Sequence, residues 1–242
     1  EQEKEREVYH AKIDFFTNVA HEIRTPLTLI KGPLENIILK KQVDAETRED
    51  LNVMKQNTER LLNLTNQLLD FRKTESQGFR LNFAKCNITE VLKETHIRFT
   101  SLAKQKGLEF TLQVPEKDFY AHVNQEAFTK IISNLLNNGM KYAESYVHVM
   151  LEIPETDDDN LFRIRTVNDG VIIPDEMKEE IFKPFVRFNE QEDGKVTTGT
   201  GIGLALSRSL AELHLGTLAM EAGEESNIFC LTLPVVQDTT IT

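Results

Sequence analysis

The sequence predicts a multidomain chain of α and α+β class, with a helical hairpin followed by an α/β sandwich. From Ile13 to Leu69 apolar residues recur at alternating steps of three and four, which is the period of packed helices. Beyond Thr74–Gly78 that period gives way to short alternating runs between shorter helical segments. The 242 residues suffice for two modest domains, and we expect them at residues 1–75 and 79–236.

The first part is predicted to be two long helices joined by a polar turn around Lys41–Glu46. The apolar positions of the first helix are Ile13, Phe16, Ala20, Ile23, Leu27, Ile30, Leu34 and Ile37. The second helix continues the same spacing from Leu51 to Leu68. Because two helices alone leave much of each apolar seam in water, we expect a homodimer in which two hairpins form a four-helix bundle.

The second part alternates strands and helices, and we expect one sheet against one helical layer. The expected strands are Phe79–Lys85, Leu108–Val114, Phe119–Val123, Tyr146–Ile153, Leu161–Val167, Thr217–Glu221 and Ile228–Pro234. The expected helices run from the cap Asn87 to about Lys106, from the cap Asn124 to Tyr142, briefly over Asp175–Ile181, and up to His214.

Composition and charge disfavour several classes of function. The chain has 28 Lys and Arg against 39 Asp and Glu, and a net charge of −11 makes nucleic acid an unlikely partner. No run approaches the ~20 apolar residues of a membrane span, so we expect no direct membrane contact in this fragment. Cys86 and Cys230 are isolated, which excludes a disulfide framework and fits a cytoplasmic setting. The charged opening without an initiator Met indicates an excised fragment.

The first candidate site is His21, which begins the run His21-Glu22-Ile23-Arg24-Thr25-Pro26-Leu27. If Ile13 is heptad position a, His21 falls at b and points to solvent. A neutral exposed imidazole with Glu22 beside it can act as a nucleophile, although a lone exposed His is more often an ordinary surface residue. Pro26 removes a helical hydrogen bond and loosens this turn. Thr25 stands where an HExxH zinc motif needs His, so that motif is excluded.

The second candidate is a polar face of the helix expected after Asn124. Asn134, Asn138 and Lys141 lie at i, i+4 and i+7, so two amides and an ammonium converge there. Carboxamide oxygen suits Mg²⁺, and Lys supplies a charge for phosphate. A solvated polar face is the alternative interpretation.

The third candidate is the glycine run Gly199-Thr200-Gly201-Ile202-Gly203-Leu204, which enters a helix. Successive glycines let backbone N–H groups approach phosphate oxygens at a helix start. No Lys-Ser/Thr follows, so this is not a Walker A loop, and the polar stretch Asn189–Thr198 before it excludes a Rossmann fingerprint.

Together and in this order, these motifs resemble the catalytic core of the sensor histidine kinases of two-component systems. The segment His21–Leu27 resembles the H box of that family, Asn134–Tyr142 its N box, Ile181–Phe185 its F box, and Gly199–Leu204 its second glycine box. The resemblance implies a dimerisation and histidine-phosphotransfer domain, followed by an ATP-binding domain of the fold shared with gyrase and certain chaperones. It further implies the cytoplasmic portion of a membrane-anchored sensor.

The resemblance also implies roles for individual residues. His21 would take the γ-phosphoryl group of ATP and pass it to an aspartate in the receiver domain of a response regulator, and Glu22 would accept the proton of the imidazole. Asn138 would ligate Mg²⁺. The other residues implied to bind the nucleotide are Asn134, Lys141, Tyr142, Asn168, Gly170, Arg187, Gly199, Thr200, Gly201, Gly203 and Leu204. The stretch Arg187–Thr198 would be a mobile lid.

The sequence departs from the family where adenine is read. The usual run is Asp-x-Gly-x-Gly-Ile-Pro, whereas Asn168 stands here for the Asp and Ile172 for the second Gly. We therefore expect weakened ATP binding, tightened by Asn168→Asp and little affected by Asp169→Ala. Two alternatives stay open. One is a dominant phosphatase activity toward the regulator, with Thr25 orienting a water, and the other is a degenerate dimeric scaffold that signals by binding.

Overall fold

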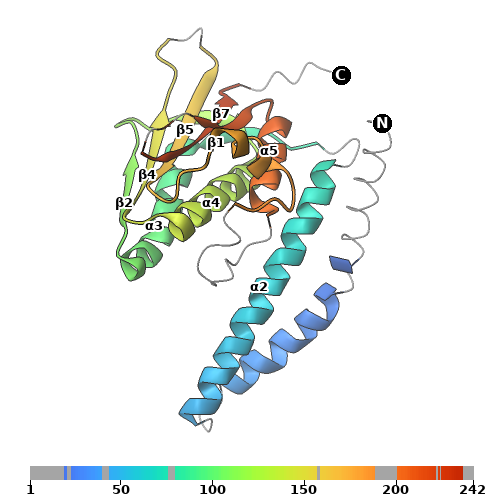
Figure 1. Ribbon diagram of the computed structural model, residues 1–242. Coiled ribbons are helices and arrows are strands. Elements are labelled where there is room, and N and C mark those ends of the chain that lie inside the picture. The colour runs from blue at the N-terminus through green and yellow to red at the C-terminus, as the bar shows by residue number, and fades with distance from the viewer. Residues whose placement is uncertain are drawn as a thin grey trace. The chain divides into compact units, whose positions relative to one another are not determined.

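The computed structural model describes residues 19–20, 23–39, 44–75, 80–156, 159–188, 201–221, 223 and 225–236 (Figure 1). They fall into two compact units, Glu1–Gln77 and Gly78–Thr242. Among the described residues, no helix combines the length and the apolar character needed to cross a membrane.

The first unit is a helical hairpin. Residues 23–38 are helical, and α2 (Ala45–Glu75) returns alongside them. Asp44 begins α2, because its carboxylate accepts the backbone N–H and the hydroxyl of Thr47, each at 2.8 Å. Between the helices, Arg24 Nη2 donates to Asn66 Oδ1 at 2.5 Å.

One heptad row of the hairpin is buried and the next is not. Ala20, Leu27 and Leu34 are seven residues apart, and their exposed fractions are only 2%, 8% and 5%. The parallel row of Ile23, Ile30 and Ile37 is 39–45% exposed. On α2 the exposed apolar positions include Met54 and Leu61. A single hairpin therefore leaves an apolar row in water.

The second unit contains a sheet of order β2-β4-β5-β7-β6, in which β2 and β4 are parallel and all other neighbours antiparallel. Its strands are β2 (Glu109–Gln113), β4 (Tyr146–Glu152), β5 (Leu161–Asn168), β6 (Thr217–Glu221) and β7 (Asn227–Pro234). A separate two-stranded sheet pairs β1 (Ala84–Asn87) with β3 (Tyr120–Val123).

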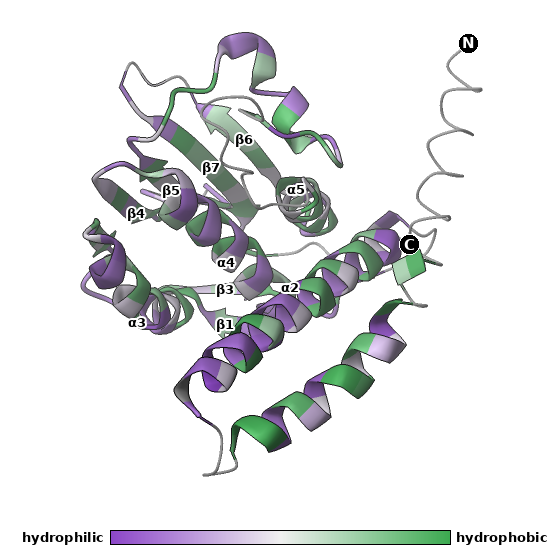
Figure 2. Ribbon diagram, turned by 60° about the horizontal axis from the view of Figure 1, so that its bottom comes forward, coloured by the Kyte–Doolittle hydropathy of each residue, from purple (hydrophilic) through white to green (hydrophobic). Residues whose placement is uncertain are grey.

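Helices α3 (Ile88–Lys106), α4 (Gln125–Tyr142) and α5 (Gly203–Leu213) lie on one face of the larger sheet (Figure 2). Asn87 and Asn124 cap α3 and α4, since each side chain accepts a backbone N–H three residues on. The core between sheet and helices is apolar, and its most enclosed side chains include Phe128, Ile131, Ile132, Leu135, Phe162, Ile164 and Leu218.

The end of α5 is closed by the pair Leu215-Gly216. The Leu215 N–H donates to the Glu212 carbonyl and the Gly216 N–H to the Ala211 carbonyl, a Schellman pattern. Leu215 takes the left-handed conformation (φ 57°) with 60% of its surface exposed. The helix end therefore places a branched side chain in a backbone region that favours glycine.

His214, one residue earlier, is fully buried and joins α5 to the start of α4. Its Nδ1 donates to the Leu210 carbonyl at 2.6 Å, and its Nε2 accepts the Asn124 N–H at 3.1 Å. This pair of bonds requires the neutral imidazole. Burial lowers the pKa of His214.

The structure corrects three expectations. The strand expected at Phe79–Lys85 is wrong in its bounds, because among the described residues from 80 to 87 only Ala84–Asn87 pairs with β3. Instead of one short helix at Asp175–Ile181 there are two 3-10 turns, Asp175–Met177 and Glu180–Phe182. The second turn ends where Pro184 forces Lys183 into extended backbone. The described part of the second unit also forms two sheets rather than one.

Candidate functional site

The polar face predicted on α4 exists, and its members have different surroundings. Asn134 Nδ2 donates to the Gly203 carbonyl at 3.3 Å and to Ser207 Oγ at 3.2 Å, which ties α4 to the first turns of α5. Asn138, one turn on, is half-buried, and its amide has no hydrogen-bond partner among the described residues. Its oxygen is therefore free to bind a ligand.

The end of α4 presents a cation and an aromatic ring together. Lys141 Nζ donates to Tyr142 Oη at 2.6 Å and lies 4.3 Å from the centre of the same ring. Tyr142 is 43% exposed. The pair is accessible, and the ammonium group is held at the surface by a contact that a phosphate could replace.

The loop that follows β5 packs closely against this end of α4. Gly170 is buried, and a Cβ atom added to it would lie 2.1 Å from the Tyr142 carbonyl oxygen. No side chain fits there, so Gly170 is required for the loop to meet the helix. Asn168 Oδ1 accepts the Gly170 N–H at 3.2 Å, an Asx turn that shapes the loop.

Asn227, at the start of β7, holds the same loop from the other side, and sequence reasoning missed it. Its Oδ1 accepts the Ile173 N–H at 3.0 Å, and its Nδ2 donates to the Val171 carbonyl at 3.0 Å, the Gly170 carbonyl at 3.3 Å and Asn168 Oδ1 at 3.4 Å. The side chain is 3% exposed. Only the pairing of β5 with β7 brings these residues together, which a local motif cannot show.

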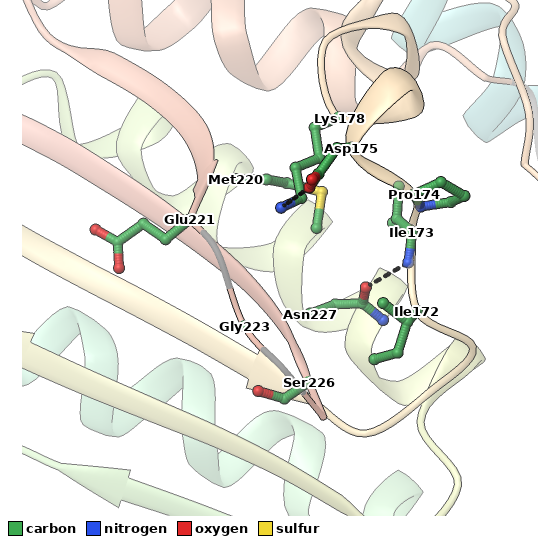
Figure 3. A pocket seen from close by; sticks show the side chains of 10 residues that line it. All are labelled: Ile172, Ile173, Pro174, Asp175, Lys178, Met220, Glu221, Gly223, Ser226 and Asn227. Carbon is green, nitrogen blue, oxygen red and sulfur yellow. Dashed lines mark hydrogen bonds and ion pairs between the residues drawn. The ribbon is translucent and has the colours of Figure 1, made fainter.

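Beyond Asn227 the loop borders a pocket of about 230 Å³ (Figure 3). Residues 172–175 line it on one side, and Met220 and Glu221 line it from β6. Figure 3 shows Asn227 Oδ1 reaching the Ile173 backbone while Lys178 pairs with Asp175 at 2.5 Å. Ile172, which replaces the usual glycine, is 41% exposed at this edge.

Asp169 turns away from this loop. Its carboxylate accepts the backbone N–H groups of Glu144, Ser145 and Tyr146 and the Ser145 hydroxyl. Burial raises its pKa, but these hydrogen bonds outweigh burial and bring the pKa to about 2. Asp169 therefore anchors the turn between α4 and β4.

The glycine run is described from Gly201 onward. Gly201 has φ 68°, and a Cβ there would lie 2.8 Å from both the Phe185 carbonyl carbon and the Val186 oxygen. The Phe185 N–H donates to the Gly201 carbonyl at 2.9 Å. The absence of a side chain at Gly201 therefore lets the start of α5 pack closely against the segment that resembles the F box. Leu204 lies in the first turn of α5, and Arg187 lies two residues after the segment that resembles the F box.

Arg208 is a second residue that the sequence did not single out. Its guanidinium lies 3.7 Å from the centre of the Phe182 ring and binds Glu179 with both terminal nitrogens, at 2.7 and 3.4 Å. Its Nε donates to the Leu218 carbonyl. The hydrogen bonds from Arg208 lower the pKa of Glu179. Arg208 fixes the two 3-10 turns to α5.

Several predicted site residues lie outside the described part of the chain, namely His21, Glu22, Gly199 and Thr200. Of the predicted lid, Arg187–Thr198, the part from Asn189 onward also lies outside the described residues. Thr25 is described and exposed, and its hydroxyl has no hydrogen-bond partner among the described residues. The structure therefore joins Asn134 to Gly203 and Gly170 to Tyr142, while the role of His21 as phospho-acceptor stays a prediction.

The chain thus combines a helical hairpin that has an exposed apolar row with an α/β sandwich that has a polar helix face and two glycine-dependent loops, and these features define the class of nucleotide-binding signalling cores. Two family models match the chain. Residues 11–77 match the His Kinase A (phospho-acceptor) domain, and residues 123–237 match the histidine kinase-, DNA gyrase B- and HSP90-like ATPase. The chain belongs to the histidine kinase family and is a sensor histidine kinase catalytic core.

Known relatives agree with this assignment. Histidine kinase P4 of Formosa agariphila is 34% identical over 238 residues, which are 97% of this chain and 17% of that protein. Sensor histidine kinase WalK of Bacillus subtilis is 28% identical over 93% of this chain and 37% of its own length. The chain thus spans less than two thirds of these relatives.

Solved structures share the fold. Full-length ShkA in complex with AMPPNP matches with a TM-score of 0.74 at 21% identity, over 91% of this chain and 45% of ShkA. Histidine kinase ThkA in complex with the response regulator protein TrrA matches with a TM-score of 0.64 at 24% identity, over 97% of this chain and 65% of the ThkA chain.

Proposed function

We propose that this chain is an ATP-dependent protein-histidine kinase that phosphorylates His21 and transfers the phosphoryl group to an aspartate of a response regulator. The observation that carries the proposal is the meeting of three segments in the second unit. The polar face of α4, the loop after β5 and the start of α5 are joined through Asn134, Gly170 and Gly203. They follow, in one chain, a hairpin that matches the phospho-acceptor domain.

The nucleotide would lie where these segments meet. Asn138 offers an amide oxygen with no partner among the described residues, which suits Mg²⁺, and Lys141 offers charge to the phosphates. Bound Mg²⁺ would neutralise phosphate charge. Asn134 is an amide that already donates to α5, so it cannot act as a base toward water. The chain therefore favours transfer to His21 over hydrolysis.

At the acceptor, Glu22 would accept the proton of the imidazole. Because a carboxylate and a neutral imidazole are both available near neutral pH, attack on the γ-phosphorus needs no other activating group from the hairpin. Gly199, Thr200 and Leu204 would complete the phosphate cradle, with Arg187 at its edge.

We also infer a homodimer and a receiver-domain partner. The exposed row of Ile23, Ile30 and Ile37 supports the dimer, since a second hairpin would remove it from water. The solved complex of ThkA with a response regulator supports the partner. A membrane-anchored parent protein is an inference from the sensor kinases that the chain resembles.

Labelling with γ-³²P Mg-ATP tests the kinase assignment. We expect label on the chain that is acid-labile and base-stable, the signature of phosphohistidine. His21→Gln should abolish it while nucleotide binding is retained, because His21 belongs to the other unit. Label on His21→Gln at the wild-type level would end the assignment. Nucleotide binding with no label on either protein would favour the scaffold alternative.

A phosphatase role is the second candidate, and the exposed hydroxyl of Thr25 supports it. Thr25 lies one helical turn after His21, where its hydroxyl could position a water near a phospho-aspartate. Thr25→Ala should prolong the phosphorylated lifetime of the regulator with little loss of autophosphorylation, and Thr25→Ser should restore the wild-type lifetime. An unchanged lifetime for Thr25→Ala excludes the role.

A further inference from the structure

The amide of Asn168 is oriented by the protein itself. Its Oδ1 accepts two donors from the chain, the Gly170 N–H at 3.2 Å and Asn227 Nδ2 at 3.4 Å. A backbone N–H can only donate, so the oxygen must face Gly170, and the reversed amide would set two donors against each other. Asn168 is 3% exposed, so it has little room to turn.

The nitrogen of the same amide is unused. Asn168 Nδ2 has no hydrogen-bond partner among the described residues. Among the described residues, the side-chain atoms that are both fully enclosed and without a partner are Arg24 Nε and Thr166 Oγ1, and Asn168 Nδ2 is not one of them. Both of its hydrogens are therefore unpaired within the described part of the chain, and the nitrogen is not fully enclosed.

Thr166 supplies a second unsatisfied group on the same side of β5. It lies two residues before Asn168, so the two side chains share one face of the strand. Its side chain is 1% exposed and its hydroxyl has no partner among the described residues. Buried hydroxyls are normally paired, so Thr166 leaves an unsatisfied, enclosed hydroxyl on the face of β5 that also carries the Asn168 amide.

We infer that Asn168 presents a hydrogen-bond donor to the nucleobase, so that this site accepts a 6-oxopurine nucleotide at least as well as an adenine nucleotide. The inference deepens the proposed function, since it rests on the nucleotide lying beside the loop after β5. Adenine carries a donor at position 6, its exocyclic amine, whereas guanine and hypoxanthine carry an acceptor, O6. An outward Nδ2 opposes the amine and pairs with the oxygen.

An aspartate at position 168 would give the opposite preference, for adenine over a 6-oxopurine. One carboxylate oxygen would still accept the bonds from Gly170 and Asn227, and the other would accept the adenine amine and repel O6. Sites built around one donor or acceptor pattern discriminate strongly against its reverse. The identity of residue 168 should therefore set the preference between the two bases.

Calorimetric titration of the full chain with ADP and with IDP in the presence of Mg²⁺ tests the inference. These nucleotides differ at the 6 position and the adjoining N1, and neither can phosphorylate the protein. We expect the wild-type Kd for IDP to equal that for ADP or to be lower. In Asn168→Asp we expect a preference for ADP of at least tenfold. Gln113→Glu adds the same charge on exposed β2 and should keep the wild-type ratio.

A wild-type preference for ADP of tenfold or more overturns the inference and leaves the proposed kinase intact, and this result does not depend on the variant folding. An unchanged ratio in folded Asn168→Asp also overturns it. If the wild-type chain binds neither nucleotide, the proposed function fails as well.

Discussion

Replacing Asn227 by Ala should destabilise the loop between β5 and the first 3-10 turn. The side chain makes four hydrogen bonds to that loop, of which the bonds to the Ile173 N–H and the Val171 carbonyl are both 3.0 Å long. The other two, to Gly170 and Asn168, are 3.3 and 3.4 Å. Alanine removes all of them and enlarges the neighbouring pocket.

The expected cost follows from these lengths. Two well-formed bonds at about 1 kcal/mol each, with a smaller contribution from the two longer ones, give about 2–3 kcal/mol. Backbone groups left buried without partners raise the upper limit to about 4 kcal/mol. Because Asn227 also fixes the oxygen of Asn168, nucleotide affinity should fall with the stability of the loop.

Hydrogen exchange and urea denaturation would measure the effect. The Ile173 amide should lose protection in Asn227→Ala, and the midpoint of unfolding of its unit should fall. Asn160→Ala is the matched control, because Asn160 is an exposed asparagine that also bonds backbone, at Val236. We expect it to cost less than about 1 kcal/mol. Equal losses in both variants, with Ile173 still protected, would refute the reasoning.

Three further predictions follow. Leu215→Gly should stabilise the second unit by about 0.5–1 kcal/mol, since relief of a left-handed Leu outweighs the added chain entropy; a lower urea midpoint would contradict this. The pKa of His214 is lowered on folding, so the stability that its neutral form contributes is complete above about pH 6.5 and is lost as the pH falls below that value. His214→Gln should therefore make the free energy of unfolding less dependent on pH between about pH 7.5 and 5.5. Asn138→Ala should damage Mg-ATP use strongly yet keep transfer from chemically phosphorylated His21 to the regulator; equal loss of both would show that Asn138 is not a nucleotide ligand.

Much of the fold was predictable, because its signals are local. The caps Asn87 and Asn124 are followed at the right distance by Glu90 and Ala127, whose N–H groups they bind. The expected helix to Tyr142 ends at that residue. The separate β1–β3 sheet was not predictable, since it pairs residues more than thirty positions apart.

The motifs of the candidate site were predictable from the sequence, but the residues that hold its loops in place were not. The glycines and the amides of α4 stand at spacings that have chemical meaning, so they could be selected from the sequence. Asn227 and Arg208 lie in an ordinary strand and an ordinary helix. Their importance comes from what the fold places beside them, the loop after β5 and the Phe182 ring. The role of Asp169 as an anchor for the Glu144–Tyr146 turn was hidden for the same reason.

The half-exposed row of Ile23, Ile30 and Ile37 has a thermodynamic consequence. If a second copy covers it, association and folding of the hairpin are linked by mass action, so the melting temperature of the first unit rises with protein concentration. The second unit encloses its own core around Phe128 and Ile164, and its melting temperature should not depend on concentration. Dilution would then lower the transition of the first unit and leave that of the second unit in place.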